Sequence, residues 1–507
     1  MARKSDLEKA EGARAGLPAG RKKTEGNPME WEVVIGLETH AELATRTKLW
    51  CDCSTEFGAA PNTHTCPICV GMPGVLPVLN RKAFELALRV AFAFKCKVPP
   101  RTFFDRKNYY YPDLPKNYQI SQNYCNTGTE GHIDIPVNGG SKRVRIHNVH
   151  LEEDAGKNIH PERSDADYSL VDLNRAGVPL LEIVTEPDMR GPEEAQAFME
   201  TMRRALLYTE VSECHMEQGH LRFEASISLR APGAAEYGAR VEIKNVNSMK
   251  AVTSAIEYEI KRQTRILNEG GKVARETRLW DDAAGATGRM RSKEEAQDYR
   301  YFPEPDLIPV TIDDEMRARV MAAVPELPLA RKRRFIEAFG LPEYDAGVIS
   351  DDRRTADFFE EALKTYDNPK AVGNWIMNAM LREMKQRGIG IVELKPKPAQ
   401  VAALAKIASS DRINSPAAQK VFTIMMDTGD DPEEIIRREG LEQTSDSGDI
   451  LPLVSKAIAD NPKAVADFKS GKASAVKFLM GQVMRMARGK ANPQVAEKII
   501  QEELGKM

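Results

Sequence analysis

Four cysteines in a short stretch give the strongest chemical signal in the sequence. They follow the pattern Cys51-x-Cys53-x12-Cys66-x2-Cys69, two close pairs separated by a loop. Each pair can turn two thiolates toward one ion, and four thiolates complete the tetrahedral shell that Zn²⁺ prefers. Such a site keeps no open coordination position, so its role would be structural. The alternative is a loop that buries small cysteines without a metal. We therefore predict a zinc loop over residues 51–69.

Acids and one histidine in strand-like segments form a second group of candidate ligands. Glu38 and His40 alternate in GLETH, so they share one face of a strand. Glu152 and Glu153 end another such segment, and Glu182 interrupts the apolar run PLLEIV. A carboxylate in an apolar strand is costly unless it is paired or holds a cation, and oxygen ligands suit Mg²⁺. Each residue alone is more simply a salt-bridge partner; only their convergence would make a site.

Two further segments concentrate basic residues. RKNYYYPDLPKNYQISQ, at 106–122, reads as a loop that brings cations beside aromatic rings. Such pairs grip nucleobases, although a well-packed surface loop explains the composition equally well. Residues 463–490 carry seven basic residues against one acid, Asp467. This stretch is either a phosphate-binding face or a solvated helix surface.

A mixed fold followed by helices is expected to position these side chains. Helical patterns occur at 80–94 and 192–208, and strand-like runs at 32–43, 143–153, 180–186 and 240–246. After about residue 315 helices dominate. We predict an α+β body over 30–315, a helical domain over 316–395 and a helical tail domain over 396–507.

Composition excludes several classes of protein. The 507 residues, 42% of them hydrophobic and 29% charged, are typical of a soluble globular protein with several cores. The net charge of −3 means that nucleic-acid binding would need a local basic patch. No apolar run reaches the length of a membrane span. Seven cysteines in so long a chain favour the reducing cytoplasm over a disulfide framework.

The N-terminal segment and the absence of two common motifs limit the possible location and chemistry of the protein. Residues 1–29 lack the apolar centre of a secretory signal and carry acids, so we predict a disordered leader. The sequence contains neither a G-x-x-x-x-G-K-[ST] phosphate loop nor a G-x-S-x-G nucleophile elbow. Any use of a nucleotide must therefore follow another design.

Long stretches of the chain resemble the B subunits of aspartyl/glutamyl-tRNA amidotransferases. The resemblance runs from about residue 31 to the C-terminus. It rests on VVIGLETHAEL, FDRKNYYYPDLPKNYQISQ, LEEDAGK, YSLVDLNRAGVPLLEIVTEPD, VEIKNVNS, ETRLWD and DYRYFPEPD, which occur in this order. It implies a mixed α/β cradle (kinase) domain, a helical neck and an all-helical YqeY-like tail domain.

The resemblance also implies a reaction. The family's B subunit uses ATP to phosphorylate the side-chain carboxylate of Glu on tRNA(Gln) or of Asp on tRNA(Asn). Ammonia, released from glutamine by the partner amidase subunit, then displaces the phosphate, and a small C subunit wraps the other two. The implied cofactors are ATP, Mg²⁺ and structural Zn²⁺, and the implied location is the cytoplasm. A non-catalytic tRNA-binding scaffold with the same fold is the alternative.

Particular residues receive roles from this resemblance. Phosphoryl transfer to a carboxylate brings negative charges together, which Mg²⁺ and basic side chains offset. The expected catalytic metal ligands are Glu38, His40, Glu153 and Glu182, with Glu152 as an outer or alternate ligand. The residues expected to line the nucleotide or the tRNA 3′ end are Lys107, Tyr109, Tyr111, Lys116, Arg222, Lys244 and Asn245. The tail residues expected to bind tRNA are Lys469, Lys472, Lys477, Arg485 and Arg488.

One segment departs from the family pattern. MEQGHLRFEASIS, at 216–228, stands where the family more usually has MEEGSLRCDANVS. Glu224 keeps an acid there with one more methylene, so its reach differs. The segment is therefore left out of the metal prediction.

Overall fold

The computed structural model describes residues 30–137, 139–161, 167–292, 298–410, 412–443, 446–472, 474–487 and 490–507. The leader predicted at 1–29 lies outside these residues. The chain divides into two units. The first comprises Met1–Leu37, Pro187–Ala195 and Glu224–Ala296, and the second Glu38–Glu186, Gln196–Phe223 and Gln297–Met507.

Antiparallel strands of the second unit carry most of the predicted site. In their order across the sheet they are the C-terminal half of β1 (Glu32–Glu42), β9 (Pro179–Thr185), β6 (Gly140–Glu153) and β5 (Gly128–Val137). The register sets Glu182 opposite His40 on one side and opposite His150 on the other. Along β1, Thr39 and Ala41 are buried while Glu38 and His40 are half-buried. The predicted alternation of Glu38 and His40 on one face is confirmed.

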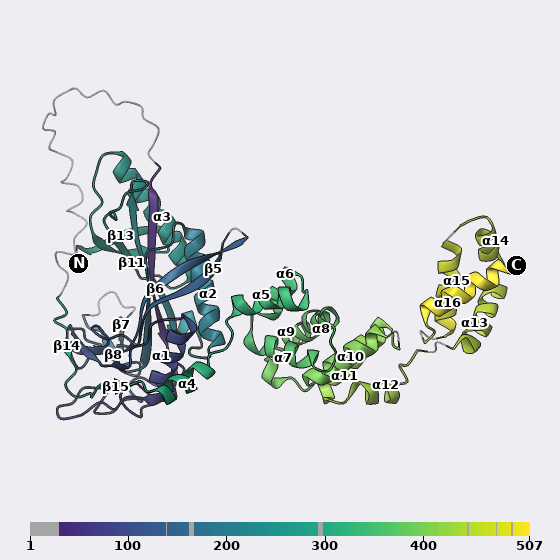
Figure 1. The fold of residues 1–507 in the computed structure, drawn as a ribbon, viewed down its shortest axis with the longest axis horizontal. Helices are drawn as coiled ribbons and strands as arrows, with labels where there is room; N and C mark the ends of the chain where they lie inside the picture. The colour runs from purple at the N-terminus through teal and green to yellow at the C-terminus, as the bar shows by residue number, and fades with distance from the viewer. Residues whose placement is uncertain are drawn as a thin grey trace, which may run out of the picture. The chain divides into compact units, whose positions relative to one another are not determined.

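Helix α1 (Arg81–Ala93) packs against β5 and β6 (Figure 1). Its apolar residues recur every three or four positions, which buries one face of the helix. Asn80 caps the helix, since its side-chain oxygen accepts a hydrogen bond from the amide of Ala83 at 3.1 Å. The Asn80 side-chain amide donates to the carbonyls of Thr47 and Lys48. Asn80 thus ties the start of α1 to the segment just before the cysteine loop. The predicted helix at 192–208 is α2 (Pro192–Tyr208).

Four further strands belong mainly to the first unit. Their order is β13 (Ala286–Ser292), β12 (Glu276–Asp281), β11 (Val241–Lys244) and β10 (Leu221–Arg230). Strands β11 and β12 are parallel, and helix α3 (Met249–Asn268) forms the crossover that a parallel pair requires. Glu259 of α3 is fully buried and is paired with Arg262 at 2.9 Å and Arg278 at 3.1 Å. These two guanidinium groups make its burial tolerable.

Short strands complete the body. They are β2 (Arg101–Thr102) with β15 (Val310–Thr311), β7 (Lys157–Ile159) with β8 (Leu170–Asp172), and β3 (Asp105–Asn108) with β4 (Tyr118–Ser121) and β14 (Phe302–Pro303). The segment at 106–122 was expected to be a loop. Its two ends pair instead as β3 and β4, so the irregular part is 109–117 together with Gln122.

Helices follow the body. They are α4 (Asp314–Ala322), α5 (Pro328–Phe339), α6 (Glu343–Ile349), α7 (Arg353–Leu363), α8 (Pro369–Trp375), a π-helical turn (Ile376–Met380), α9 (Leu381–Arg387), α10 (Pro398–Ser409), α11 (Ser415–Thr428), α12 (Pro432–Glu439), α13 (Ser447–Asp460), α14 (Pro462–Lys469), α15 (Ser474–Met486) and α16 (Pro493–Gly505). One hydrophobic core runs from Phe335 to Ile436, and another from Ile450 to Leu504. The predicted fold class, an α+β body followed by helical domains, is confirmed, and the predicted domain boundaries stay predictions. Among the described residues no helix is both long and apolar enough to cross a membrane.

Replacing Asn80 tests the link between α1 and the cysteine loop. Asn80→Ala removes the helix cap and the amide donors, and we expect the free energy of unfolding of the body to fall by about 1–3 kcal/mol. Asn80→Asp keeps the capping oxygen and removes the donors to Thr47 and Lys48, so its loss should be smaller. Denaturant unfolding followed by tryptophan fluorescence measures both. Equal stability of Asn80→Asp and wild type would mean that the contacts to Thr47 and Lys48 contribute nothing.

Candidate active site and cysteine cluster

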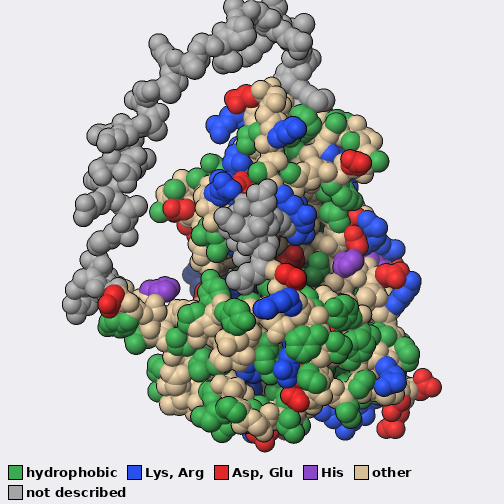
Figure 2. All heavy atoms as spheres, turned by 90° about the vertical axis from the view of Figure 1, so that its left-hand side faces the viewer, with side chains coloured by type: hydrophobic (Ala, Val, Ile, Leu, Met, Phe, Trp, Pro, Cys, Tyr) green, Lys and Arg blue, Asp and Glu red, His purple; other side chains and the backbone are tan. Residues whose placement is uncertain are grey.

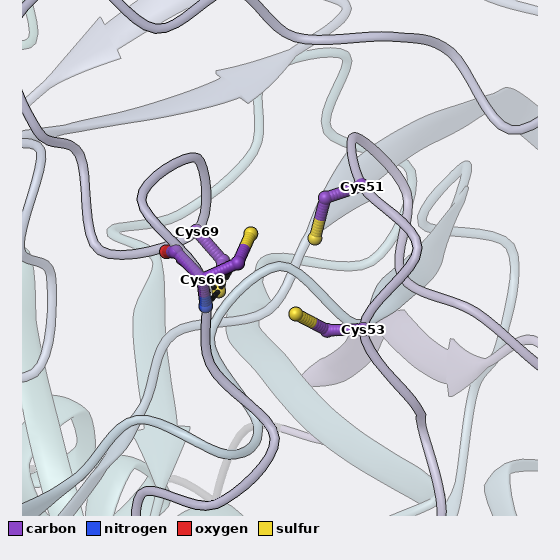
Figure 3. Close-up of side chains that lie close together, drawn as sticks. All are labelled: Cys51, Cys53, Cys66 and Cys69. Atoms are coloured by element: carbon purple, nitrogen blue, oxygen red, sulfur yellow. Dashed lines mark hydrogen bonds between the residues drawn. The ribbon is translucent and has the colours of Figure 1, made fainter.

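The four cysteines of the predicted zinc loop converge (Figure 3). Their sulfur atoms all lie within 4.8 Å of one another, with Cys66 Sγ and Cys69 Sγ 3.9 Å apart. Cys66 and Cys69 stand on a tight turn, in which the amide of Cys66 donates to Cys69 Sγ at 3.1 Å and the amide of Val70 donates to the Cys66 carbonyl. The convergence predicted from the spacing is confirmed. Four thiols around one point fit a tetrahedral Zn²⁺ site.

Electrostatics around the cluster favour a thiolate at Cys69. A hydrogen bond from Cys51 is the largest influence and, against the effect of burial, lowers the pKa of Cys69 to about 4. The ammonium of Lys48 acts in the same direction. Lys48 is fully buried and donates to the carbonyls of His64 and Leu173. A buried cation thus accompanies thiols that must lose protons to bind a metal.

His40, Glu152 and Glu182 form a second cluster, on β1, β6 and β9. One ligand atom from each lies within 4.8 Å of the others. The His40 Nε2 atom is 3.3 Å from Glu182 Oε2 and 3.9 Å from Glu152 Oε1. His150 of β6 joins them, with its Nε2 atom 3.1 Å from Glu182 Oε2. Glu182 therefore lies between two imidazole rings, one from each neighbouring strand.

The charges in this cluster stabilise one another. Burial alone would lower the pKa of His40, but the carboxylates of Glu182 and Glu152 outweigh it and raise that pKa to about 9. The pKa of His150 is raised by the same two acids despite burial. Burial would raise the pKa of Glu182, yet His150 and His40 hold it well below its usual value. Near neutral pH the protein without a bound cation thus holds His40 as an imidazolium beside ionised Glu182.

Lys107 on β3 brings a further charge and several aromatic rings. Burial would lower its pKa, but Glu152, Tyr301 and Glu182 raise it, so the ammonium is held. Its Nζ atom is 5.3 Å from the centre of the Tyr299 ring and 6.0 Å from that of Tyr109. The Tyr299 ring contacts two other rings edge to face. Its centroid is 5.9 Å from that of Tyr109 and 6.0 Å from that of Tyr301. Three packed tyrosine rings thus lie beside the cation.

The structure separates Glu153 from Glu152. Glu153 pairs with the ammonium of Lys116, accepts the amide of Ile120 at 2.9 Å and is almost fully buried. Glu152 instead accepts the Ser121 hydroxyl at 3.2 Å and contributes to the histidine cluster. Adjacent residues of a strand point to opposite faces, which explains the division. Only Glu152 of the two is brought to His40 and Glu182.

Arg222 forms an ion pair with Asp154, the acid that follows Glu152 and Glu153 in the chain. Its Nη2 atom is 2.8 Å from Asp154 Oδ2, and Arg175 lies 3.5 Å from the same oxygen. Burial would raise the pKa of Asp154, but these two guanidinium groups lower it. Arg222 is therefore held by an ion pair within the second unit.

Two predicted residues, Lys244 and Asn245, lie in the first unit. Lys244 Nζ is 2.7 Å from Glu224 and 3.2 Å from Glu242. Glu224, in the segment that departs from the family pattern, is thus an ion-pair partner of Lys244. Asn245 has a left-handed backbone, with φ of 62°, and donates to the Trp280 carbonyl at 3.1 Å.

The remaining predicted residues differ in exposure. Glu38 is half-buried on β1, opposite Val184. Tyr111 is exposed in the loop between β3 and β4. In the tail, Lys469, Lys472, Lys477 and Arg485 are exposed on or beside α14 and α15, and Arg488 lies outside the described residues. Acidic and basic side chains are interspersed on the face shown in Figure 2, as the small net charge suggests.

Sequence reasoning missed His150, Tyr299 and Tyr301 as members of the site. His150 could have been found, because it alternates with Glu152 along HNVHLEE and so must share its face. The two tyrosines lie about 190 residues after Tyr109 in the chain, and no local pattern connects them.

Fold and site together define a class of protein: an α+β body with an acid–imidazole centre and a four-thiol loop, continued by helical domains. Residues 33–318 match the family model of the GatB/GatE catalytic domain, and residues 357–504 match that of the GatB domain. The chain is 50% identical to the B subunit of the aspartyl/glutamyl-tRNA(Asn/Gln) amidotransferase of Carboxydothermus hydrogenoformans and 51% identical to that of Caldicellulosiruptor saccharolyticus. Each match covers 94% of this chain and 100% of the relative. The chain belongs to the GatB family, and the resemblance found in the sequence is confirmed.

Replacing one of the four cysteines tests the proposed zinc site. We expect Cys66→Ser to lose most of the bound zinc and to unfold at a temperature several degrees lower, because three ligands hold the loop less tightly. Cys125→Ser, outside the cluster, is the control and should keep its zinc. Elemental analysis and thermal unfolding measure the two effects. Full zinc content in Cys66→Ser would contradict the four-thiol assignment.

Proposed function

We propose that this protein is the ATP-dependent subunit of a glutamine-dependent tRNA amidotransferase. It activates the side-chain carboxylate of Glu on tRNA(Gln), of Asp on tRNA(Asn), or of both, as an acyl phosphate. Ammonia from a partner amidase subunit then gives Gln-tRNA(Gln) or Asn-tRNA(Asn). The proposal rests on the convergence of His40, Glu152 and Glu182 beside Lys107, in a chain half identical to subunits that carry this name.

In this proposal His40, Glu152 and Glu182 hold Mg²⁺. Two carboxylates and an imidazole would serve as protein ligands of a divalent cation. When bound, the cation draws negative charge from the transferring phosphoryl group. His150 contacts Glu182 at 3.1 Å and orients its carboxylate. Glu38, on the same face of β1, and Glu153, on the opposite side of β6, remain proposed members of the catalytic set.

The basic and aromatic residues serve the substrates in this proposal. Lys107 interacts electrostatically with Glu152 and Glu182, and its ammonium offsets the approach of a carboxylate to a triphosphate. Tyr109 and Tyr111 offer rings to the terminal adenosine of the tRNA or to that of ATP. The remaining proposed contacts to these substrates come from Lys116, Arg222, Lys244 and Asn245.

The proposal also includes the partners and the setting of the protein. The chain acts in the cytoplasm, together with the amidase subunit and a small C subunit. Zn²⁺ in the cysteine loop is structural, because four thiolates leave no open position. The exposed basic residues of α14 and α15 contact tRNA phosphates.

Substitutions in the centre distinguish the enzyme from a non-catalytic tRNA-binding scaffold. Glu182→Gln keeps the size of the side chain and removes its charge, and we expect amide formation by the reconstituted complex to fall roughly 10²–10³-fold. The assay supplies ATP, glutamine and misacylated tRNA, and follows ADP and amidated product. His147→Asn, at a surface pair with Glu186, is the control. Unchanged amide formation in Glu182→Gln and in His40→Ala would support the scaffold.

Cation binding should release protons. His40 has a pKa of about 9 without a cation and must be neutral to act as a ligand. At neutral pH, Mg²⁺ binding should therefore release about one proton, and its affinity should rise about tenfold per pH unit as the pH approaches that pKa. Titration calorimetry in buffers of different ionisation enthalpy measures the release. Equal release by wild type and His40→Asn would rule out His40 as the ligand.

Tail substitutions test the contact with tRNA. Lys477→Ala and Arg485→Ala together remove two exposed cations from α15. We expect a higher KM for tRNA, an unchanged kcat, and a salt dependence whose slope is smaller by roughly one for each charge removed. Lys420→Ala, at a surface pair with Glu439, is the control. An unchanged KM in the double variant would place the tRNA contact elsewhere.

A further inference from the structure

The turn that carries Cys66 and Cys69 ends against the side chain of Lys116. The amide of Gly71 donates to the Ile68 carbonyl at 3.1 Å, and Gly71 has a φ of +70°. A Cβ atom added to Gly71 would lie 2.6 Å from Lys116 Cγ and 3.2 Å from Lys116 Cα. No side chain fits there unless the backbone or the near end of Lys116 moves. Only a glycine lets the turn lie directly on the lysine.

The turn contacts the flexible stem of Lys116 near its backbone, while Glu153 and the Tyr118 ring hold its ammonium. The four-carbon chain of this lysine can take many rotamers, yet its ammonium is held on Glu153 with both side chains largely buried. The same Glu153 oxygen also accepts the Ile120 amide. A cavity of about 190 Å³ lies beside this pair, and its lining includes Gly71, Cys69, Lys116 and Glu153. The lysine therefore has space into which it could move if the turn shifted.

The turn itself is fixed at the cysteine cluster. Cys66 and Cys69 anchor it through the Cys66 amide on Cys69 Sγ, and the amide of Met72 closes it on the Pro67 carbonyl at 2.9 Å. The contacts thus run without a break from the four thiols to Gly71, from Gly71 to Lys116, and from Lys116 to Glu153. Glu153 is the neighbour in β6 of Glu152, which belongs to the histidine cluster.

We propose that Gly71 is a positioning residue, through which the cysteine loop holds Lys116 against Glu153. The loop then acts on more than stability, since it sets the place of the ammonium that pairs with Glu153, the neighbour of Glu152 in β6. This inference rests on the proposed function only for its activity readout. The placement of Lys116 can be measured without any activity.

A matched pair of glycine variants tests the contact. Gly71→Ala introduces both backbone strain and the clash with Lys116. Gly74→Ala, three residues further on, introduces comparable strain at φ of +84° but meets no atom within 4 Å. In the complex with its partner subunits we expect Gly71→Ala to lower kcat for amide formation about tenfold, an effect in the range of outer-sphere positioning residues. Gly74→Ala should stay close to wild type, and both should keep their zinc. Equal losses in the two variants would overturn the proposal.

Two more measurements separate positioning from general damage. In the Lys116→Met background, Gly71→Ala should cause no further loss of kcat, because residues that act through one another are not additive. A tenfold further loss in that background would overturn the proposal. Amine-reactive labelling read by mass spectrometry should modify Lys116 several-fold faster in Gly71→Ala than in wild type or Gly74→Ala. Unchanged labelling would also overturn it. A wild-type complex that forms no amide would refute the proposed function but leave the labelling test in force.

Discussion

The charge of Glu182 in the middle of an apolar strand is the constraint on which the site depends. Leu181 and Ile183 on either side are fully buried, and the Glu182 side chain on the opposite face is itself largely buried, with 13% of its surface exposed. It is stabilised by one imidazole from β1 and one from β6. A shift of either strand by one residue would turn its histidine to the opposite face. The free energy of that buried charge therefore helps to fix the register of three strands.

Three consecutive acids at the end of β6 are likewise buried and paired with cationic side chains. Glu152 turns to the histidine cluster, Glu153 to Lys116, and Asp154 to Arg222 and Arg175. All three are buried, and each has its own cationic partners. A run that looks like one acidic patch in the sequence is thus divided among three sets of ion-pair partners. This separation lets neighbouring carboxylates serve different tasks.

What the sequence could predict depended on how far apart the interacting residues lie in the chain. The cysteine cluster was predictable because its ligands span only 51–69, and α2 because its apolar period is regular. The shared face of Glu38 and His40 followed from strand alternation. The choice between Glu152 and Glu153 could not be made, since the phase of a strand relative to its neighbours is a property of the sheet. Tyr299 reaches Lys107 only through tertiary packing, which no local pattern reports.

The distance in sequence between β1 and β9 has a consequence for synthesis on the ribosome. All four cysteines lie within residues 51–69, so every thiol of the cluster has been made while most of the chain is still unmade. Glu182, the partner of His40, lies in β9 and is made only about 140 residues after His40. The nascent chain therefore contains all four thiols of the cysteine cluster long before it contains both halves of the charged centre.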